Sequence, residues 1–184
     1  MYTSHIGRIF LRAYNEREKT SYHAQEFFNS VFWKLFFDSP KYMMYVTNST
    51  FVQSAGTKSS AKYNTNDAEA RLRLKHNFNL KITGDETYGK EEYRYDPLSL
   101  KGARDASTCV GYPAQHSTQP TNSMVTSMTI NIPLEEAYLS WIGAALGIGT
   151  EENYCFYFDH PPLLLEIFDG WSEYRKQLDQ TPTS

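Results

Sequence analysis

One stretch of the chain constrains the fold more than any other: SYHAQEFFNSVFWKLFFDSP, residues 21–40. Its apolar residues recur at spacings of three and four, which is the period of one face of a helix. They are Ala24, Phe27, Phe28, Val31, Phe32, Leu35 and Phe36. Ser21 is of a type favoured as an N-cap, and Asp38-Ser39-Pro40 stops the pattern. We expect a helix here, with a face too aromatic for water that lies across a sheet or in a helical core.

Five other segments predict strands, because their apolar residues alternate or because they are rich in β-branched and aromatic residues. They are residues 6–14 (IGRIFLRAY), 41–53 (KYMMYVTNSTFVQ), 71–82 (RLRLKHNFNLKI), 123–133 (SMVTSMTINIP) and 152–159 (ENYCFYFD). The alternation is almost strict in 71–82, where Leu72, Leu74 and Phe78 share one expected face. This segment therefore predicts a strand with one buried face and one basic face.

Two further segments predict amphipathic helices, residues 134–149 and 161–178. Between the elements, about 84–123 has no sustained period and is rich in Gly, Pro and Ser, which predicts a long irregular segment. The resulting order predicts a single domain, 1–184, of the α+β or α/β class. We expect one mixed sheet of about five to six strands with about three amphipathic helices packed on it.

The composition bounds the class of protein. A chain of 184 residues is long enough to bury a core without disulfides or metals, and 14 Tyr, 11 Phe and 3 Trp argue against disorder. Two cysteines make no disulfide framework, the N-terminal residues form no apolar leader, and no run approaches the roughly 18 apolar residues of a membrane span. We therefore expect a cytoplasmic protein with free thiols and no membrane contact.

Charge is unevenly distributed along the chain. Residues 51–85 carry six basic and three acidic side chains, a balance of +3, whereas residues 151–184 carry two basic and seven acidic ones, a balance of −5. Such asymmetry predicts either a polyanion guided to one face or pairing with a protein partner or a second copy. Ordinary solvated surface is the alternative.

The basic side chains of the first region are the candidate binding residues: Lys58, Lys62, Arg71, Arg73, Lys75 and Lys81. Basic groups with Tyr63 nearby suit the backbone and bases of a nucleic acid. The alternative is a solvent-facing strand whose charges discourage edge pairing. We interpret the chain as an intracellular, non-catalytic binding module or assembly subunit that contacts nucleic acid through this face, without a cofactor or a resident metal.

A metal-dependent nuclease or hydrolase is the alternative function. Asp159 ends an expected strand, and Glu166 and Asp169 follow on the expected helix, so that their carboxylates could hold a divalent cation. However, Asp is also a favoured N-cap and Pro is favoured in the first helical turn, so capping explains Asp159-His160-Pro161-Pro162 without catalysis. We expect Asp159 to cap the helix.

Two weaker hypotheses remain. Arg17 and His23, six residues apart, have the spacing of an Arg that stabilises phosphate charge and a His that acts as acid or base. A solvated loop Arg and a His at a helix start explain the pair more simply. The third hypothesis is a small-molecule enzyme whose pocket lies in the segment 84–123.

Overall fold

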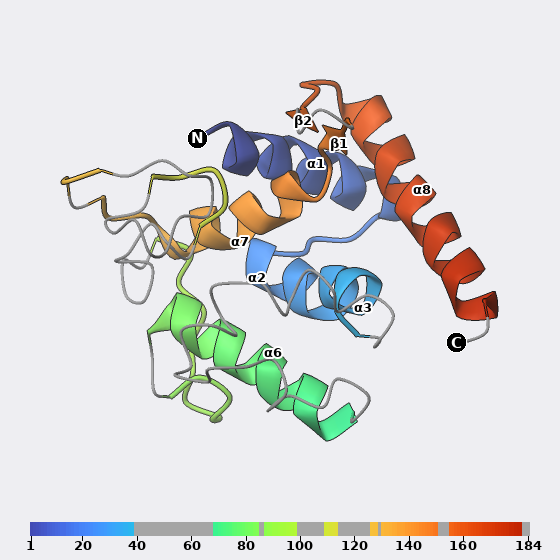
Figure 1. The fold of residues 1–184 in the computed structure, drawn as a ribbon. Helices are drawn as coiled ribbons and strands as arrows, with labels where there is room; N and C mark the ends of the chain where they lie inside the picture. The colour runs from blue at the N-terminus through green and yellow to red at the C-terminus, as the bar shows by residue number, and fades with distance from the viewer. Residues whose placement is uncertain are drawn as a thin grey trace.

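A computed structural model of the chain describes residues 1–38, 68–84, 87–98, 109–113, 126–128, 130–150 and 155–181. Figure 1 shows that these residues are mostly helical. The elements are α1 (Tyr2–Glu18), α2 (Ala24–Phe27), the π-helical turn η1 (Phe28–Phe32), α3 (Trp33–Phe36), α6 (Ala68–Thr83), α7 (Leu134–Ala144), β1 (Ile148–Gly149), β2 (Cys155–Phe156) and α8 (Pro161–Gln180).

The predicted fold class is wrong. Across the described ranges the only sheet is a two-stranded antiparallel hairpin, in which Ile148 pairs with Phe156 and Gly149 with Cys155. Helices are present at the three expected places, 21–38, 134–149 and 161–178. The first begins at Ala24 rather than after Ser21, and the second ends at Ala144, so that Ile148–Gly149 form β1 instead. The strand expected at 152–159 is reduced to Cys155–Phe156.

Two predicted strands are helices. Residues 6–14 lie within α1, where the buried residues Thr3, Ile6, Gly7, Phe10 and Leu11 recur at the three- and four-residue spacing of one helical face. Residues 71–82 lie within α6, where Leu72 is 63% exposed while Phe78 and Ile82 are buried. The apparent alternation arises because apolar residues are spread around α6 rather than confined to one stripe.

The other expected segments have mixed outcomes. Residues 41–53 lie outside the described residues, and the described parts of 123–133 form no strand. Within 84–123, the described residues 87–98 and 109–113 are turns and irregular chain, and Cys109 and Tyr112 are part of the core. The single domain of 1–184 stays a prediction.

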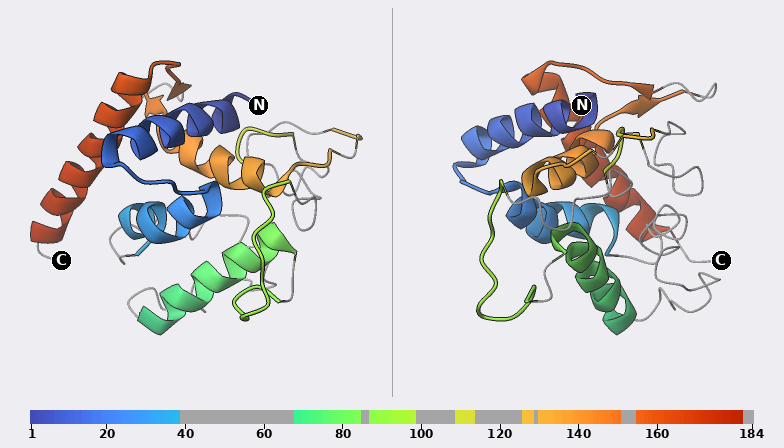
Figure 2. Two further views of the ribbon diagram at one scale, coloured as in Figure 1. Left: turned by 180° about the vertical axis from the view of Figure 1, so that it is seen from behind. Right: turned by 90° about the vertical axis from the view of Figure 1, so that its left-hand side faces the viewer.

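The centre of the fold is the close contact of α1 with α7 (Figures 1 and 2). Small residues face each other there, and a Cβ atom added to Gly7 would overlap the Leu139 carbonyl of α7. A Cβ on Gly143 would likewise overlap the Thr3 carbonyl of α1. The absence of both side chains therefore allows the two backbones to approach directly.

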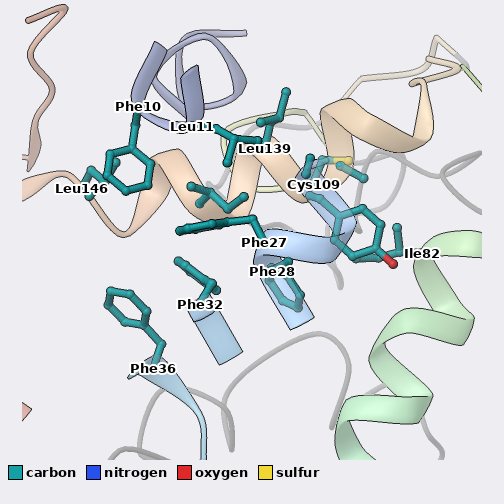
Figure 3. Close-up of a cluster of buried hydrophobic side chains, with 14 of the residues drawn as sticks. Phe10, Leu11, Phe27, Phe28, Phe32, Phe36, Ile82, Cys109, Leu139 and Leu146 are labelled. Atoms are coloured by element: carbon teal, nitrogen blue, oxygen red, sulfur yellow. The ribbon is translucent and has the colours of Figure 1, made fainter. Parts of the chain in front are cut away.

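Aromatic side chains fill the space between this pair and the η1 segment. Figure 3 shows Phe27, Phe28, Phe32 and Phe36 in one buried cluster with Phe10, Leu139 and Leu146. Adjacent rings along this row are in contact; the Phe28 and Phe32 ring centroids, for example, are 5.1 Å apart. The aromatic face predicted from residues 21–40 is thus confirmed as the main core, in a helical setting.

The last helix closes one side of this core. α8 contacts α1 and α3, and Phe168 lies 5.0 Å from Phe10 between ring centroids (Figure 1). Trp171 donates its indole N–H to the Ala145 carbonyl at 2.9 Å, which ties α8 to the end of α7. No helix in the described ranges is long and apolar enough to cross a membrane.

Candidate functional site

Asp159 does not cap the last helix. The N-cap of α8 is His160, whose Nδ1 accepts a hydrogen bond from the Leu163 amide at 3.2 Å. Asp159 is exposed, and its Oδ2 lies 3.0 Å from Nε2 of His5 in α1. The predicted cap is therefore displaced by one residue, and Asp159 joins α1 to the chain that precedes α8.

The three acids proposed for a cation do not converge. Glu166 is exposed on α8, and both carboxylate oxygens of Asp169 accept from the Arg17 guanidinium, at 2.7 and 3.0 Å. In the part of the chain that the structure describes, no three His, Cys, Asp or Glu residues lie close enough together to hold a metal ion. The arrangement gives the metal-dependent nuclease hypothesis no geometric support.

Arg17 and His23 contact different residues in the structure. Arg17 forms ion pairs with Asp169 and with Glu18, and the hydrogen bonds to Asp169 raise its pKa. His23 is the N-cap residue of α2 without a side-chain cap, and its ring lies 5.7 Å from the Tyr95 ring. Arg17 therefore bridges α1 and α8, and no contact joins it to His23 among the described residues.

The predicted basic face takes a different form. Lys58 and Lys62 lie outside the described residues; Arg73 and Lys81 belong to α6, but their side chains are likewise outside the description. Arg71 is largely buried, with Nε 3.6 Å from Oδ1 of Asp38. Lys75 is partly buried and donates to a backbone carbonyl. The two described members are thus drawn into the fold rather than spread over an open face.

The contact of Lys75 is explained by the π-helical turn. The Trp33 amide donates to the Phe28 carbonyl five residues back, so it is not available to the Asn29 carbonyl four residues back. The Lys75 ammonium donates to that Asn29 carbonyl at 2.6 Å. Burial lowers the pKa of Lys75. Lys75 therefore stabilises an irregular turn in the core helix.

A buried polar cluster continues from this turn. The side-chain amides of Asn29 and Asn79 form a reciprocal pair, with N–O distances of 3.0 and 2.8 Å. The Tyr138 hydroxyl donates to Oδ1 of Asn79 at 2.6 Å and accepts from Gln25 at 3.1 Å. Burial raises the pKa of Tyr138 and raises that of the neighbouring Tyr88 to about 12. These groups satisfy one another, which marks the cluster as a structural junction of η1, α6 and α7.

An exposed apolar surface lies at the β-hairpin. Ile148 and Phe156 are direct cross-strand partners, so their side chains share one face; they are 44% and 55% exposed. Phe158, two residues further on, is 37% exposed. We call Ile148, Phe156 and Phe158 the hairpin face.

The opposite side of the hairpin is packed against the body of the protein. A Cβ atom placed on Gly147 would meet Sγ of Cys155 and the Tyr157 ring, and the Tyr157 ring lies 5.1 Å from that of Tyr2 in α1. Figure 2 shows the hairpin beside the N-terminal end of α1. Tyr157 therefore turns toward α1, and its neighbours Phe156 and Phe158 turn to the other side.

Sequence reasoning missed both features, although each has a sequence signal. Asn29 borders the aromatic stripe of the strongest helix, three residues before Phe32, and a polar residue beside a buried face signals a hydrogen-bonded partner. The alternation from Cys155 to Phe158 predicts a strand, and the same alternation puts Phe156 and Phe158 together on one face.

Comparisons with protein-family models, with curated proteins and with solved structures found no match for this chain. Function is therefore argued from its own surfaces.

Proposed function

We propose that the chain is a binding or assembly subunit that docks onto another protein through the hairpin face. The observation that carries the proposal is the clustering of exposed apolar groups. Nine large hydrophobic side chains are exposed among the described residues, and three of them, Ile148, Phe156 and Phe158, form the hairpin face. Exposed hydrophobic residues on the helices lie apart from it, for example Leu72 on α6 and Tyr174 on α8.

Two properties of this region favour a protein as the occupant. Clustered aromatic and aliphatic groups are characteristic of the central part of protein interfaces. In addition, the hairpin is a two-stranded sheet, so each strand has one edge whose backbone groups can pair with an extended segment of a partner. A partner that supplies both apolar side chains and a strand would complete the sheet and cover the face.

The proposal predicts that the triple variant Ile148→Ser, Phe156→Ser, Phe158→Ser loses its partner while it remains folded. Removal of three anchors is expected to reduce recovery of the partner at least tenfold, equivalent to about 1.4 kcal/mol or more of binding free energy. The measurement is quantitative copurification from the native host, followed by reconstitution with the recovered partner. Far-ultraviolet circular dichroism and thermal melting check the fold.

The double variant Leu98→Ser, Tyr174→Ser is the matched control, since it removes exposed apolar groups elsewhere and should leave recovery unchanged. Equal loss in the control and in the triple variant would contradict a specific docking face. Self-association of the pure protein that the triple variant abolishes, measured by sedimentation velocity, would identify a second copy as the occupant instead.

Nucleic acid is the second candidate, favoured by the basic balance of residues 51–85. Because Arg71 and Lys75 make contacts within the fold, Lys58 and Lys62 are the better residues to test. We expect Lys58→Gln, Lys62→Gln to lower the slope of log affinity against log salt by up to about two. Fluorescence anisotropy with single- and double-stranded oligonucleotides measures it.

The control for this experiment is Lys19→Gln, Lys90→Gln, which removes the same charge from other surfaces. Absence of binding at low salt, or equal slopes in both variants, would exclude a nucleic-acid surface at Lys58 and Lys62. The protein-docking proposal stands or falls separately, because its variants lie on the hairpin.

A further inference from the structure

The outer edge of β2 continues beyond the hairpin without a neighbouring strand. In the described part of the chain β2 pairs with β1 alone, and Phe158 and Asp159, which follow it, form no backbone–backbone hydrogen bond. His160 still has an extended backbone, with φ −145° and ψ 100°. Figures 1 and 2 show this stretch at the periphery of the molecule, between the hairpin and the start of α8. It therefore offers backbone donors and acceptors to an extended segment of another protein.

The side chains of this stretch point alternately to the two faces of the hairpin. The Tyr157 ring lies 5.1 Å from the Tyr2 ring of α1, and Oδ2 of Asp159 lies 3.0 Å from Nε2 of His5, also in α1. The phenylalanines of the hairpin face lie on the opposite side. Cross-strand neighbours share a face, so a strand added at this edge places two apolar residues beside the hairpin face and a residue of another kind beside Asp159.

The Asp159 carboxylate can accept a second partner. Its side chain is 65% exposed, and Oδ1 has no hydrogen-bond or ion-pair partner in the described part of the chain. A neutral imidazole of His5 that donates its N–H to Oδ2 leaves the negative charge of the carboxylate in place. A Lys or Arg of a neighbouring strand is the side chain that suits this position.

The charge around the hairpin also favours a basic partner. Residues 105–174 contain nine acidic residues and no Lys or Arg. In α1, Arg8 and Arg17 are paired with acids of α7 and α8, and Arg12 lies seven residues from His5, about 10 Å along the helix. This charge disfavours a nucleic acid or an anionic lipid surface at the hairpin and favours a basic segment. The nine acids are Asp105, Glu135, Glu136, Glu151, Glu152, Asp159, Glu166, Asp169 and Glu173.

We propose that the docking partner supplies an extended segment in which apolar residues alternate with Lys or Arg, and that this segment pairs with the outer edge of β2. Its apolar side chains cover the hairpin face, and one of its basic side chains binds Oδ1 of Asp159. This inference rests on the docking function and specifies the chemistry of the partner.

The peptide acetyl-Lys-Val-Lys-Val-Lys-Val-Lys-amide is the probe, because it has this alternation. Titration into the full chain should give saturable shifts of the Phe156, Phe158 and Asp159 amide signals in ¹H–¹⁵N NMR spectra. A peptide with Glu in place of Lys should bind at least tenfold more weakly, and one with Ser in place of Val at least fivefold. A fully N-methylated peptide, which has no backbone donors, should also lose at least tenfold in affinity.

Substitution of Asp159 tests the charge directly. Asp159→Asn should weaken binding of the Lys–Val peptide at least threefold and Asp159→Lys at least tenfold. Glu92→Lys is the matched control, since Glu92 is an exposed acid outside residues 105–174, and it should leave the affinity unchanged. Added salt should weaken binding to the wild type more than binding to Asp159→Asn, because one ion pair fewer is screened.

Equal affinities of the Lys and Glu peptides, or of Asp159→Lys and Glu92→Lys for the Lys–Val peptide, would overturn the inference. So would absence of saturable binding at millimolar peptide, or unchanged binding in Phe156→Ser, Phe158→Ser, because the peptide then lies elsewhere. Copurification distinguishes this failure from failure of the docking function. If the triple hairpin variant loses its partner while Asp159→Lys retains it, docking stands and the basic partner segment is excluded.

Discussion

The His160 side chain caps the start of α8, whereas the side chain of the neighbouring Asp159 does not. Its Nδ1 accepts from the Leu163 amide, one of the donors that the first turn of a helix leaves without an intrahelical partner. The contact requires a ring nitrogen with a free lone pair, so a doubly protonated imidazole cannot make it. Asp159, one residue earlier, meets His5 in an exposed hydrogen-bonding contact that should add little stability.

This difference gives a prediction for neighbouring residues. His160→Ala should lower the free energy of unfolding by about 0.5–1 kcal/mol, because an amide at the start of α8 loses its acceptor. His160→Asp should restore most of that loss. Asp159→Asn is the matched control and should change stability by less than about 0.5 kcal/mol. Urea denaturation measures all three; a larger loss in Asp159→Asn than in His160→Ala would contradict the assignment of the cap.

At the scale of elements, the contact of α1 with α7 depends on two glycines. Gly143→Ala should destabilise the protein by about 1–3 kcal/mol or more, since the new methyl group overlaps the Thr3 carbonyl and the helices must separate. Gly170 provides the control, because it also lies within a helix but a Cβ there meets nothing within 4 Å. Gly170→Ala should raise stability by about 0.5–1 kcal/mol. Thermal and urea unfolding would contradict this account if both substitutions had the same sign.

At the scale of the whole molecule, buried tyrosines link stability to alkaline pH. Burial raises the pKa of Tyr88 to about 12, from an ordinary value of 10.0, and also raises those of Tyr95 and Tyr138. A group with a raised pKa in the folded state stabilises the fold fully below its unfolded value, and this contribution disappears as pH rises through its folded value. For Tyr88 the loss falls between about pH 10 and 12.

We therefore expect the urea concentration at the unfolding midpoint to fall progressively as the pH rises above 10. Tyrosine absorbance at 295 nm should show one group of residues that ionises with ordinary behaviour and a second group that ionises only as the protein unfolds. Tyr88→Phe should reduce the slope of stability against pH in this range, whereas Tyr174→Phe, at an exposed position, should not. Complete, reversible ionisation of all tyrosines without unfolding would contradict the burial of the cluster.

Part of this fold is predictable from the sequence, and the reason is physical. The segments that became η1 and α8 bury one apolar stripe each, and that pattern is visible in the residues themselves. The inner face of α6 includes Lys75 and Asn79, whose burial depends on partners supplied by Asn29 and Tyr138. A hydropathy pattern does not show which polar residues pair with each other. For this reason the pattern of residues 71–82 predicts a strand where α6 forms.

The strand predicted at residues 6–14, which lie in α1, is wrong for a related reason. Its contact face includes Thr3 and Gly7, which are buried because another backbone comes close, not because their side chains are apolar. Of the candidate sites, the expected basic residues and acids could be named from sequence, but their ion pairs with distant residues could not.

The close approach of Gly7 to Gly143 has a consequence for how the chain reaches this structure. The contact joins residues about 136 positions apart, counted as 143 minus 7, and closing so long a loop costs about 4 kcal/mol in a simple chain model. α1 cannot pack against α7 until α7 has left the ribosome, so the aromatic side chains of the first helices stay uncovered until then. The two helices can therefore pair only late in synthesis, and the rate of folding should be limited by this distant pairing rather than by helix formation.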